Sequence, residues 1–287
     1  MDRIYSFALV FLLCLASAAG AVLIDSGDGT GNTTAPSPDP GWSNVGERSL
    51  WSAVYLGDGW VVTAWHVGAG PVILDGVTYP HLPSLVTRID NGDGTFADLL
   101  VFGLEPPHPL LPDLTLASVA PAVGESAILI GNGLDRGAAT TWQPNPPTPP
   151  TLEGYEWGGA RSMRWGTNEI TDPSIISLPS AITTAISTDF DEGATPHESQ
   201  AVNGDSGGAL FVDNAGSWEL AGMLFAIDAY LGQPSFTSLY GNRTYSVDIA
   251  HYRDAILDVT SVPEPAGGLL AGLALMRMLA RRASSRP

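Results

Sequence analysis

Cysteine and basic residues are scarce in this chain, and each shortage excludes some classes of function. Its 287 residues include one cysteine, Cys14, which lies in a segment that we expect to be removed. A mature chain without cysteine has no disulfide, no thiol nucleophile and no cysteine-ligated zinc. Only 12 Lys and Arg stand against 30 Asp and Glu, giving a net charge of −18. Nucleic acids and anionic membranes bind through clustered basic side chains, so neither is an expected partner.

Apolar runs long enough to span a membrane are also missing near the start of the chain. Residues 4–15 are apolar, follow a charged start, and precede the small-residue segments 16–18 (Ala-Ser-Ala) and 19–21 (Ala-Gly-Ala). This is the pattern of a cleaved signal peptide, to which we assign residues 1–21. A membrane span needs about 20 apolar residues, so we expect secretion rather than a permanent N-terminal anchor.

The C-terminal end of the chain carries a second targeting signal. Residues 262–265 (Val-Pro-Glu-Pro) are followed by the apolar residues 266–280 and then by two arginines. This tail, residues 259–287, resembles the PEP-CTERM sorting signal of Gram-negative bacteria. The resemblance implies processing by an exosortase-type enzyme and a secreted or cell-surface location. Arg277 interrupts the apolar stretch, so we expect membrane association through this end, as through the signal peptide, to be transient.

Between the two ends, the composition favours short strands joined by tight turns. The chain contains 33 Gly and 23 Pro, which predicts an all-β fold. After the brief apolar residues 22–24, the chain is rich in Gly, Asp, Thr, Ser and Pro, so we interpret residues 22–41 as a linker or pro-segment. A helical pattern is present only at residues 249–257. Residues 144–150, rich in Pro, predict a loop between two halves. The predicted strands are residues 52–56, 60–64, 72–74, 99–104, 127–130, 182–187, 209–212 and 220–227.

Residues 204–208 (Gly-Asp-Ser-Gly-Gly) form the most specific motif, and the apolar residues 209–212 follow them. A serine hydroxyl attacks a carbonyl only if it is exposed and backbone N–H groups face the developing oxyanion. Glycines on both sides permit the tight turn that this arrangement needs. We therefore expect Ser206 to be a nucleophile, with the amides of Gly204 and Ser206 as the oxyanion donors.

A histidine and an acid with suitable surroundings precede this motif. The strand at residues 60–64 ends just before His66, which places an imidazole beyond a rigid element, as a general base requires. Asp98 precedes the apolar residues 99–102. A carboxylate at the start of a buried strand can accept the histidine Nδ1–H and fix its tautomer. Asp113 is the alternative acid, less favoured because polar residues break the apolar run after it.

Taken in order, Thr-Ala-x-His, Asp-Leu-Leu and Gly-Asp-Ser-Gly-Gly resemble the signatures of the chymotrypsin/trypsin clan of serine proteases. The resemblance covers about residues 45–258. It implies a protease domain at residues 42–258, made of two six-stranded antiparallel β-barrels, about 42–135 and 136–258, and a short C-terminal helix. It also implies a secreted, monomeric serine endopeptidase that needs no cofactor and hydrolyses proteins or peptides. The site residues would be His66, Asp98 and Ser206.

The clan's activation signal is not evident. Enzymes of this clan that are made as zymogens place a new apolar N-terminus beside the acid that precedes the nucleophile, here Asp205. The chain has no Ile-Val-Gly-Gly start, and residues 44–46 (Asn-Val-Gly) are the nearest remnant. We therefore expect Asp205 to meet a local partner instead.

The resemblance also places the pocket for the substrate side chain. The position at the pocket base is Gln200, whose neutral amide would not pair with Lys or Arg as a carboxylate would. Residues 224–227 (Leu-Phe-Ala-Ile) match the pocket-wall strand, with Phe225 in place of the serine common there. Ala226 and Ile227 predict an apolar wall.

Parts of the sequence are also compatible with two other functions and with a metal site. An α/β-hydrolase esterase also uses G-x-S-x-G, but it orders its triad as serine, acid and histidine, which would recruit Asp228 or Asp248 with His251, and it needs alternating strands and helices. A catalytically silent binding module on a protease fold is the second alternative. The acidic residues 90–94 offer oxygen ligands to calcium but lack the EF-hand spacing, so we expect an Asx turn and no metal.

Overall fold

The computed structural model describes residues 22–144 and 151–261, and most of them lie in strands. Two helices are present in this part of the chain, η1 (Trp42–Asn44) and α1 (Ile249–Thr260). The strands are β1 (Leu23–Ile24), β2 (Val45–Arg48), β3 (Trp51–Gly57), β4 (Trp60–Thr63), β5 (Val72–Leu74), β6 (Val77–Tyr79), β7 (His81–Asp90), β8 (Phe96–Leu104), β9 (Ser126–Gly131), β10 (Leu134–Trp142), β11 (Leu152–Arg161), β12 (Arg164–Leu178), β13 (Ala181–Asp189), β14 (Ser199–Gln200), β15 (Ala209–Asn214), β16 (Ser217–Ile227), β17 (Thr237–Leu239) and β18 (Arg243–Asp248).

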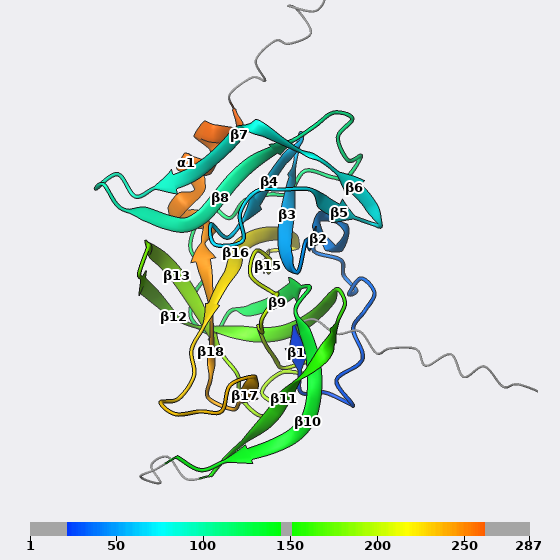
Figure 1. Ribbon diagram of the computed structural model, residues 1–287, viewed down its shortest axis with the longest axis vertical. Helices are drawn as coiled ribbons and strands as arrows, with labels where there is room; N and C mark the ends of the chain where they lie inside the picture. The colour runs from blue at the N-terminus through cyan, green and yellow to red at the C-terminus, as the bar shows by residue number, and fades with distance from the viewer. Residues whose placement is uncertain (1–21, 145–150, 262–287) are drawn as a thin grey trace, which may run out of the picture.

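The first half of the chain forms one antiparallel sheet in the order β6-β5-β2-β3-β4-β8-β7. Its two edge strands, β6 and β7, follow each other in the chain and are joined by Pro80 alone, so the sheet curls and brings the ends of these strands together at Pro80 (Figure 1). The central strands β3, β4 and β8 are buried along almost their whole length, which explains why their apolar runs were legible in the sequence.

The second half forms a closed barrel in the order β12-β13-β18-β16-β15-β9. The prediction of an all-β fold with a C-terminal helix is confirmed. Two details differ from it. The sheet of the first half has seven strands rather than six. The boundary between the halves lies before β9, not near residue 135, because β9 pairs with β12 and β15 of the barrel.

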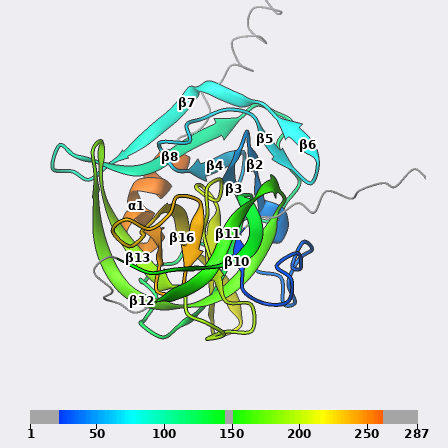
Figure 2. The ribbon, with the colours of Figure 1, turned by 60° about the horizontal axis from the view of Figure 1, so that its bottom comes forward.

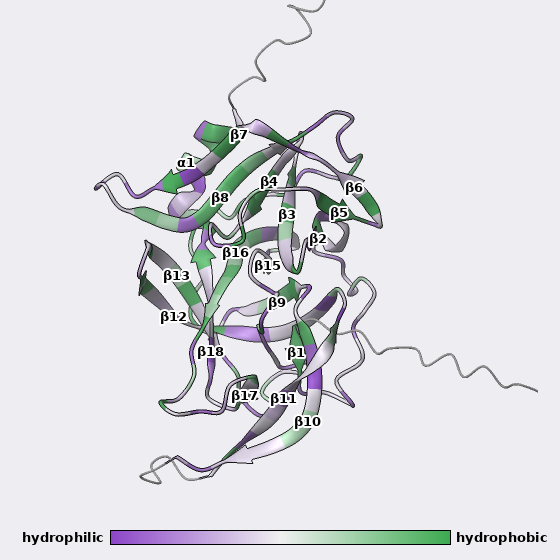
Figure 3. Cartoon of the chain, viewed as in Figure 1, coloured by the Kyte–Doolittle hydropathy of each residue, from purple (hydrophilic) through white to green (hydrophobic). Residues whose placement is uncertain are grey.

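One hydrophobic core joins the two halves. It contains Val62 and Val101 from the first sheet and Phe211 and Met223 from the barrel, together with Ile256 of α1. Figure 3 shows the strands that carry these residues, among them β8 and β16, as predominantly hydrophobic. Burying these side chains against one another fixes the position of one half relative to the other. A site between the halves is therefore held by a packed interface.

The helix α1 occupies the place that the periodic pattern predicted. The side chain of Asp248 caps its N-terminus by accepting a hydrogen bond from the amide of His251 at 3.2 Å. Within the described residues, no helix is long and apolar enough to cross a membrane.

The N-terminal segment, residues 22–41, departs from the linker interpretation because it packs on the second half. Leu23 and Ile24 form β1, which pairs with β14, and both are buried. Arg136 donates hydrogen bonds to the carbonyls of Ile24, Asp25 and Gly27 at 3.0, 2.6 and 2.7 Å. The polar composition concealed this arrangement, because arginine binds the segment through backbone carbonyls, which every sequence has.

A third, accessory sheet has the order β10-β11-β17. It lies below the closed barrel in Figure 1, and Figure 2 brings the hairpin of β10 and β11 to the front. The Pro-rich residues 144–150 fall between β10 and β11, within the second half rather than between the halves. Of them, residues 145–150 lie outside the described residues.

Glu198 is a buried carboxylic acid of the second half. Its carboxylate accepts hydrogen bonds from Asn168 Nδ2 at 2.9 Å, from the amide of Thr195 at 3.1 Å and from the Thr195 hydroxyl at 2.8 Å. Burial raises the pKa of Glu198 from its ordinary 4.5 to about 7. The folded protein therefore keeps a proton that the unfolded chain releases, and the stability linked to this group is lost as the pH rises from about 4.5 to about 7.

Glu198→Gln is expected to remove this contribution, because an amide does not titrate. The free energy of unfolding of the native protein should fall more between pH 5 and pH 8 than that of the variant. Urea unfolding at the two pH values measures the difference. Equal pH dependence in both proteins would show that Glu198 does not titrate in this range.

Candidate active site

The imidazole of His66 and the carboxylate of Asp98 meet as the sequence predicted. His66 Nδ1 lies 2.7 Å from Asp98 Oδ2, and the backbone amide of His66 donates to Asp98 Oδ1 at 3.0 Å. Asp98 lies on β8 and is 2% exposed, whereas the side chain of His66 is 37% exposed. The two contacts fix both the position and the ring orientation of the histidine, so that Nε2 is the nitrogen left to face a substrate.

Asp98 is itself held by the second half of the chain. Its backbone amide donates to the hydroxyl of Thr183, a fully buried residue of β13, at 2.9 Å. Thr183 was not singled out from the sequence, because a threonine within a strand carries no local signal of a contact 85 residues away. The carboxylate that orients His66 is therefore placed by both halves at once.

Ser206 lies on the loop between β14 and β15 and lines the same cavity as His66. This cavity, the active-site cavity, has a volume of about 240 Å³. The ring of Trp51 stands edge-on to the imidazole, with centroids 5.7 Å apart, and forms part of its wall. The remaining lining residues are Trp157, Ala201, Val202, Asn203, Leu224, Phe225, Ala226 and Ile227.

The glycines beside Ser206 shape the loop as the motif predicted. Gly204 and Gly207 have φ values of +106° and +87°, in the region that favours glycine. A Cβ atom on Gly207 would collide with the backbone oxygen of Ser52. Within the described part of the chain, no acceptor takes the amide hydrogens of Gly204 and Ser206.

No family model and no curated protein matches the chain. Its fold is, however, similar to that of solved protease structures. The serine protease neuropsin from mouse brain superposes with a TM-score of 0.52, over 80% of this chain and 99% of neuropsin, at 17% identity. The chain has the chymotrypsin-like fold. The Rv3671c protease of M. tuberculosis (TM-score 0.46, 16% identity, 76% and 88% of the two chains) and the NS6 protease of murine norovirus 1 (0.46, 14%, 77% and 97%) also match. The likeness to neuropsin, at 17% identity, establishes the fold, and the chemistry must be argued from the residues of the site.

In this chymotrypsin-like fold, Ser52 ties the nucleophile loop to the first half. It is fully buried on β3, and its amide donates to the carbonyl of Ser206 at 2.9 Å. Its hydroxyl donates to the carbonyl of Gly204 at 3.1 Å and accepts from the amide of Asn132 at 2.9 Å. Ser52 was not predicted as a site residue, because a serine in an otherwise apolar strand is uninformative until its partners are known.

Asp205 has a partner that no sequence motif predicted. Its fully buried carboxylate accepts hydrogen bonds from the amides of Gly133 at 2.7 Å, Val202 at 2.8 Å and Val22 at 3.2 Å. Two of these are local to the site, as expected, but Val22 is 183 residues away in sequence. Burial raises the pKa of Asp205 to about 6, against the opposing effect of these three amides.

The pocket residues are placed in part as predicted. Phe225, Ala226 and Ile227 line the active-site cavity, whose lining does not include Gln200. Gln200 is 1% exposed and lies on β14, opposite Leu23 of β1. The resemblance predicted Gln200 as the pocket base, but the edge of β14 is covered by the N-terminal strand β1.

The alternative acids lie elsewhere. Asp113 lines a separate cavity with Leu56 and Leu257. Asp228 accepts from the hydroxyl of Tyr245, and Asp248 caps α1 next to His251, so neither alternative triad of the esterase surrounds Ser206. In the turn at residues 90–94, the Asp90 carboxylate accepts from the amide of Gly92 at 2.6 Å, which is the predicted Asx turn.

Proposed function

We propose that this protein is a serine endopeptidase in which Ser206 is the nucleophile, His66 the general base and Asp98 the acid that orients His66. The observation that carries the proposal is the 2.7 Å contact between His66 Nδ1 and the buried Asp98, at the wall of a cavity that also contains Ser206. A buried carboxylate at this distance stabilises the imidazolium that forms when histidine accepts a proton.

The reaction then follows from the arrangement. Ser206 Oγ forms a bond to the scissile carbonyl carbon while its proton passes to His66 Nε2. The oxyanion of the tetrahedral intermediate accepts hydrogen bonds from the amides of Gly204 and Ser206, each typically worth ~3 kcal/mol of barrier. His66 gives its proton to the departing amine, which leaves an acyl-enzyme. Water attacks this ester, His66 takes the water's proton, and the proton returns to Ser206 Oγ as the acid product leaves.

The cavity wall supports a preference for an apolar side chain before the scissile bond. Ala201, Val202, Leu224 and Ala226 line it, and none of them carries a charge. A lysine or arginine placed among these side chains would lose hydration without gaining a carboxylate partner.

The proposal is tested by digesting casein with the purified protein and mapping the new termini by mass spectrometry. Cleavage within the chain, predominantly after apolar residues, is expected. A folded protein that leaves casein intact would instead favour the silent binding module. Release of single terminal residues alone would contradict an endopeptidase.

Asp98→Asn is expected to lower kcat by about 10⁴-fold, because an asparagine amide favours the wrong tautomer of His66. Peptide hydrolysis by the native protein and the variant measures the effect. Asp113→Asn is the matched control, since Asp113 lies in another cavity, and should retain native activity. A loss in Asp113→Asn as large as that in Asp98→Asn would contradict the role given to Asp98.

Export and sorting belong to the same proposal. Removal of residues 1–21 as a signal peptide, processing of the tail 259–287 by an exosortase-type enzyme, and release at the surface of a Gram-negative bacterium follow from the sequence patterns. The mature enzyme would act as a monomer on proteins or peptides outside the cell. The tail lies almost wholly outside the described residues.

The position of Val22 supports cleavage immediately before it. Val22 is fully buried, and its backbone nitrogen lies 3.2 Å from Asp205 Oδ1. Its φ of +23° is unfavourable for a β-branched residue. Cleavage of the preceding peptide bond abolishes this dihedral and turns the nitrogen into an α-ammonium group. The positive charge then pairs with the carboxylate next to the nucleophile, where the amides supply only dipoles.

A further inference from the structure

A second cavity adjoins the active-site cavity on the accessory sheet. We call it the distal groove; its volume is about 330 Å³, and it is lined by Thr140, Trp142, Glu156, Trp157, Pro234, Ser235, Phe236 and Thr237. Trp157 lines both cavities. The two cavities therefore share one residue of their walls, and we infer that a chain bound in the first continues past Trp157 toward the second.

Aromatic rings on two different segments form the walls of the distal groove. Phe236 stands edge-on to Trp157, with ring centroids 5.7 Å apart, and its carbonyl accepts from the amide of Trp157 at 2.8 Å. The indole of Trp157 is fixed in turn, because Nε1 donates to the hydroxyl of Ser238 at 2.9 Å. Phe236 is nevertheless 63% exposed, and it has a φ of +59°. Strained backbone of this kind clusters at binding and active sites, which makes the exposed ring of Phe236 a candidate contact for a ligand.

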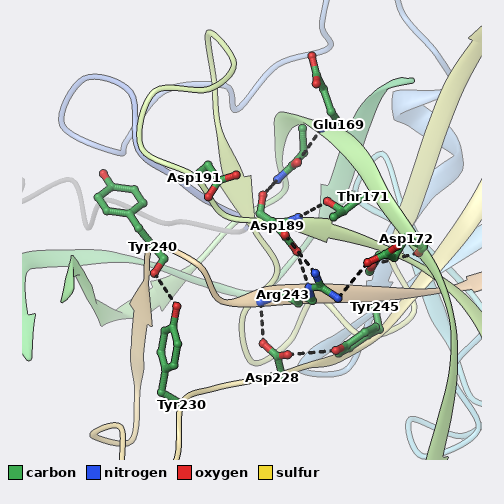
Figure 4. A network of polar contacts seen from close by, with 12 residues as sticks. Glu169, Thr171, Asp172, Asp189, Asp191, Asp228, Tyr230, Tyr240, Arg243 and Tyr245 are labelled. Carbon is green, nitrogen blue, oxygen red and sulfur yellow. Dashed lines mark hydrogen bonds and ion pairs between the residues drawn. The ribbon is translucent and has the colours of Figure 1, made fainter. Parts of the chain in front are cut away.

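The segment that carries Phe236, residues 228–242, is anchored to the barrel at both ends. Figure 4 shows Asp228 between the neighbouring residues Arg243 and Tyr245 of β18: its carboxylate accepts from the amide of Arg243 at 2.7 Å and from the hydroxyl of Tyr245 at 3.0 Å. The hydroxyl of Tyr230 donates to the carbonyl of Tyr240 at 3.3 Å, across the segment. These contacts fix the segment that carries Phe236 relative to the barrel in the free protein.

The strand β16 gives the direction in which a substrate reaches the groove. β15 pairs with β16 only as far as Met223, so Phe225–Ile227 extend past β15 along the active-site cavity. A peptide can add to this edge as an antiparallel strand. Leu224 is the end near the nucleophile, since its carbonyl accepts from the amide of Gly207 at 2.7 Å. The residues upstream of the scissile bond therefore pass Ile227 and continue toward residues 228–242.

We propose that the distal groove is an upstream subsite that binds an apolar side chain of the polypeptide substrate, several residues before the scissile bond. This inference rests on the proposed endopeptidase function. Continuity with the active-site cavity through Trp157 selects the substrate as the occupant. The enzyme thus selects extended polypeptides with two apolar anchor positions, one in each cavity.

The test uses peptides of fixed cleavage site in which one Leu is moved through the second to the sixth upstream position in a Ser/Gly background. For the native protein, kcat/KM should peak about tenfold above the background at a position at least three residues upstream, as burial of one apolar side chain allows. Phe236→Asn, which keeps a residue that tolerates positive φ, should flatten this peak. It should leave hydrolysis of short substrates that lack upstream residues unchanged.

Leu231→Asn is the matched control, because Leu231 lies in the same segment, is fully exposed and does not line the groove; it should keep the peak. Affinities of the same peptides for a Ser206→Ala protein test the groove independently of catalysis. If the native protein cleaves nothing but Leu-dependent binding is lost in Phe236→Asn, the endopeptidase proposal fails and the groove stands. Three results would overturn the subsite. The first is a peak that survives Phe236→Asn, and the second is an equal loss of activity of this variant on short substrates. The third is self-association of the native protein that is lost in Phe236→Asn.

Discussion

Ser206→Ala is expected to lower kcat for peptide hydrolysis by about 10⁶-fold, and His66→Ala by a similar factor. Without the hydroxyl there is no nucleophile for the acyl-enzyme, and without the imidazole no group takes its proton. Because the two residues act as a unit, the double variant should be hardly worse than either single one. Steady-state hydrolysis of a chromogenic peptide with an apolar residue before the scissile bond measures all three.

Two exposed residues provide matched controls for these variants. Ser217→Ala on β16 and His251→Ala on α1 change the same residue types outside the active-site cavity and should keep native kcat. The His251 variant also addresses the esterase alternative, which assigns the base to His251. Loss of activity in His251→Ala with retention in His66→Ala would reverse the assignment.

A chain that starts at Val22 is expected to be at least about 10²-fold more active than one that carries even a single additional residue before it. Removing one partner of a buried ion pair costs about 3–5 kcal/mol, and 1.4 kcal/mol corresponds to a factor of ten. The loss appears as activity because Asp205 immediately precedes Ser206 in the loop that presents the oxyanion donors. Proteins with defined first residues, released from a removable fusion partner, allow kcat/KM to be compared directly.

The pH dependence of the activity shows whether the charge of the N-terminal ammonium group is required, or only the removal of the preceding residues. An α-amino group has an ordinary pKa of about 8, and a buried carboxylate partner raises it. The charge is present below the raised pKa, so the activity of the Val22 protein should fall as the pH rises past it. The protein with an additional residue before Val22 and the Asp205→Asn variant should both be weakly active, and their activity should not show this fall at high pH. Equal activity of the extended and Val22 proteins would show that the ion pair is dispensable.

The sequence was sufficient to predict the parts of the structure that local patterns encode. Apolar runs such as residues 99–104 become buried strands because a hydrophobic core covers each face, with Leu99 and Val101 in one core and Leu100, Phe102 and Leu104 in another. The periodic residues 249–257 lie within α1. The pairing of His66 with Asp98 was predictable because each follows or begins a strand of strong apolar character. The strong apolar run after Asp98 was also the reason for preferring Asp98 to Asp113 as the acid that orients His66.

The unpredicted parts depend on contacts between distant segments. Val22 reaches Asp205 across 183 residues, and Ser52 reaches Gly204 across 152. No local pattern records either contact. The accessory sheet was missed for another reason: β10 and β11 are half-exposed along most of their length, so their residues do not alternate cleanly between apolar and polar. The pairing of β10 with β11, and of β11 with β17, is a tertiary effect that overrides weak propensity.

Labelling with a fluorophosphonate, followed by peptide mapping, tests the central claim most directly. A fluorophosphonate reacts with a serine hydroxyl only where a base activates it and oxyanion donors are in place. We predict one adduct per molecule, on Ser206, in the native protein and in Ser217→Ala, and no adduct in His66→Ala. An adduct on another serine, or undiminished labelling of Ser206 in His66→Ala, would contradict the assignment of the site.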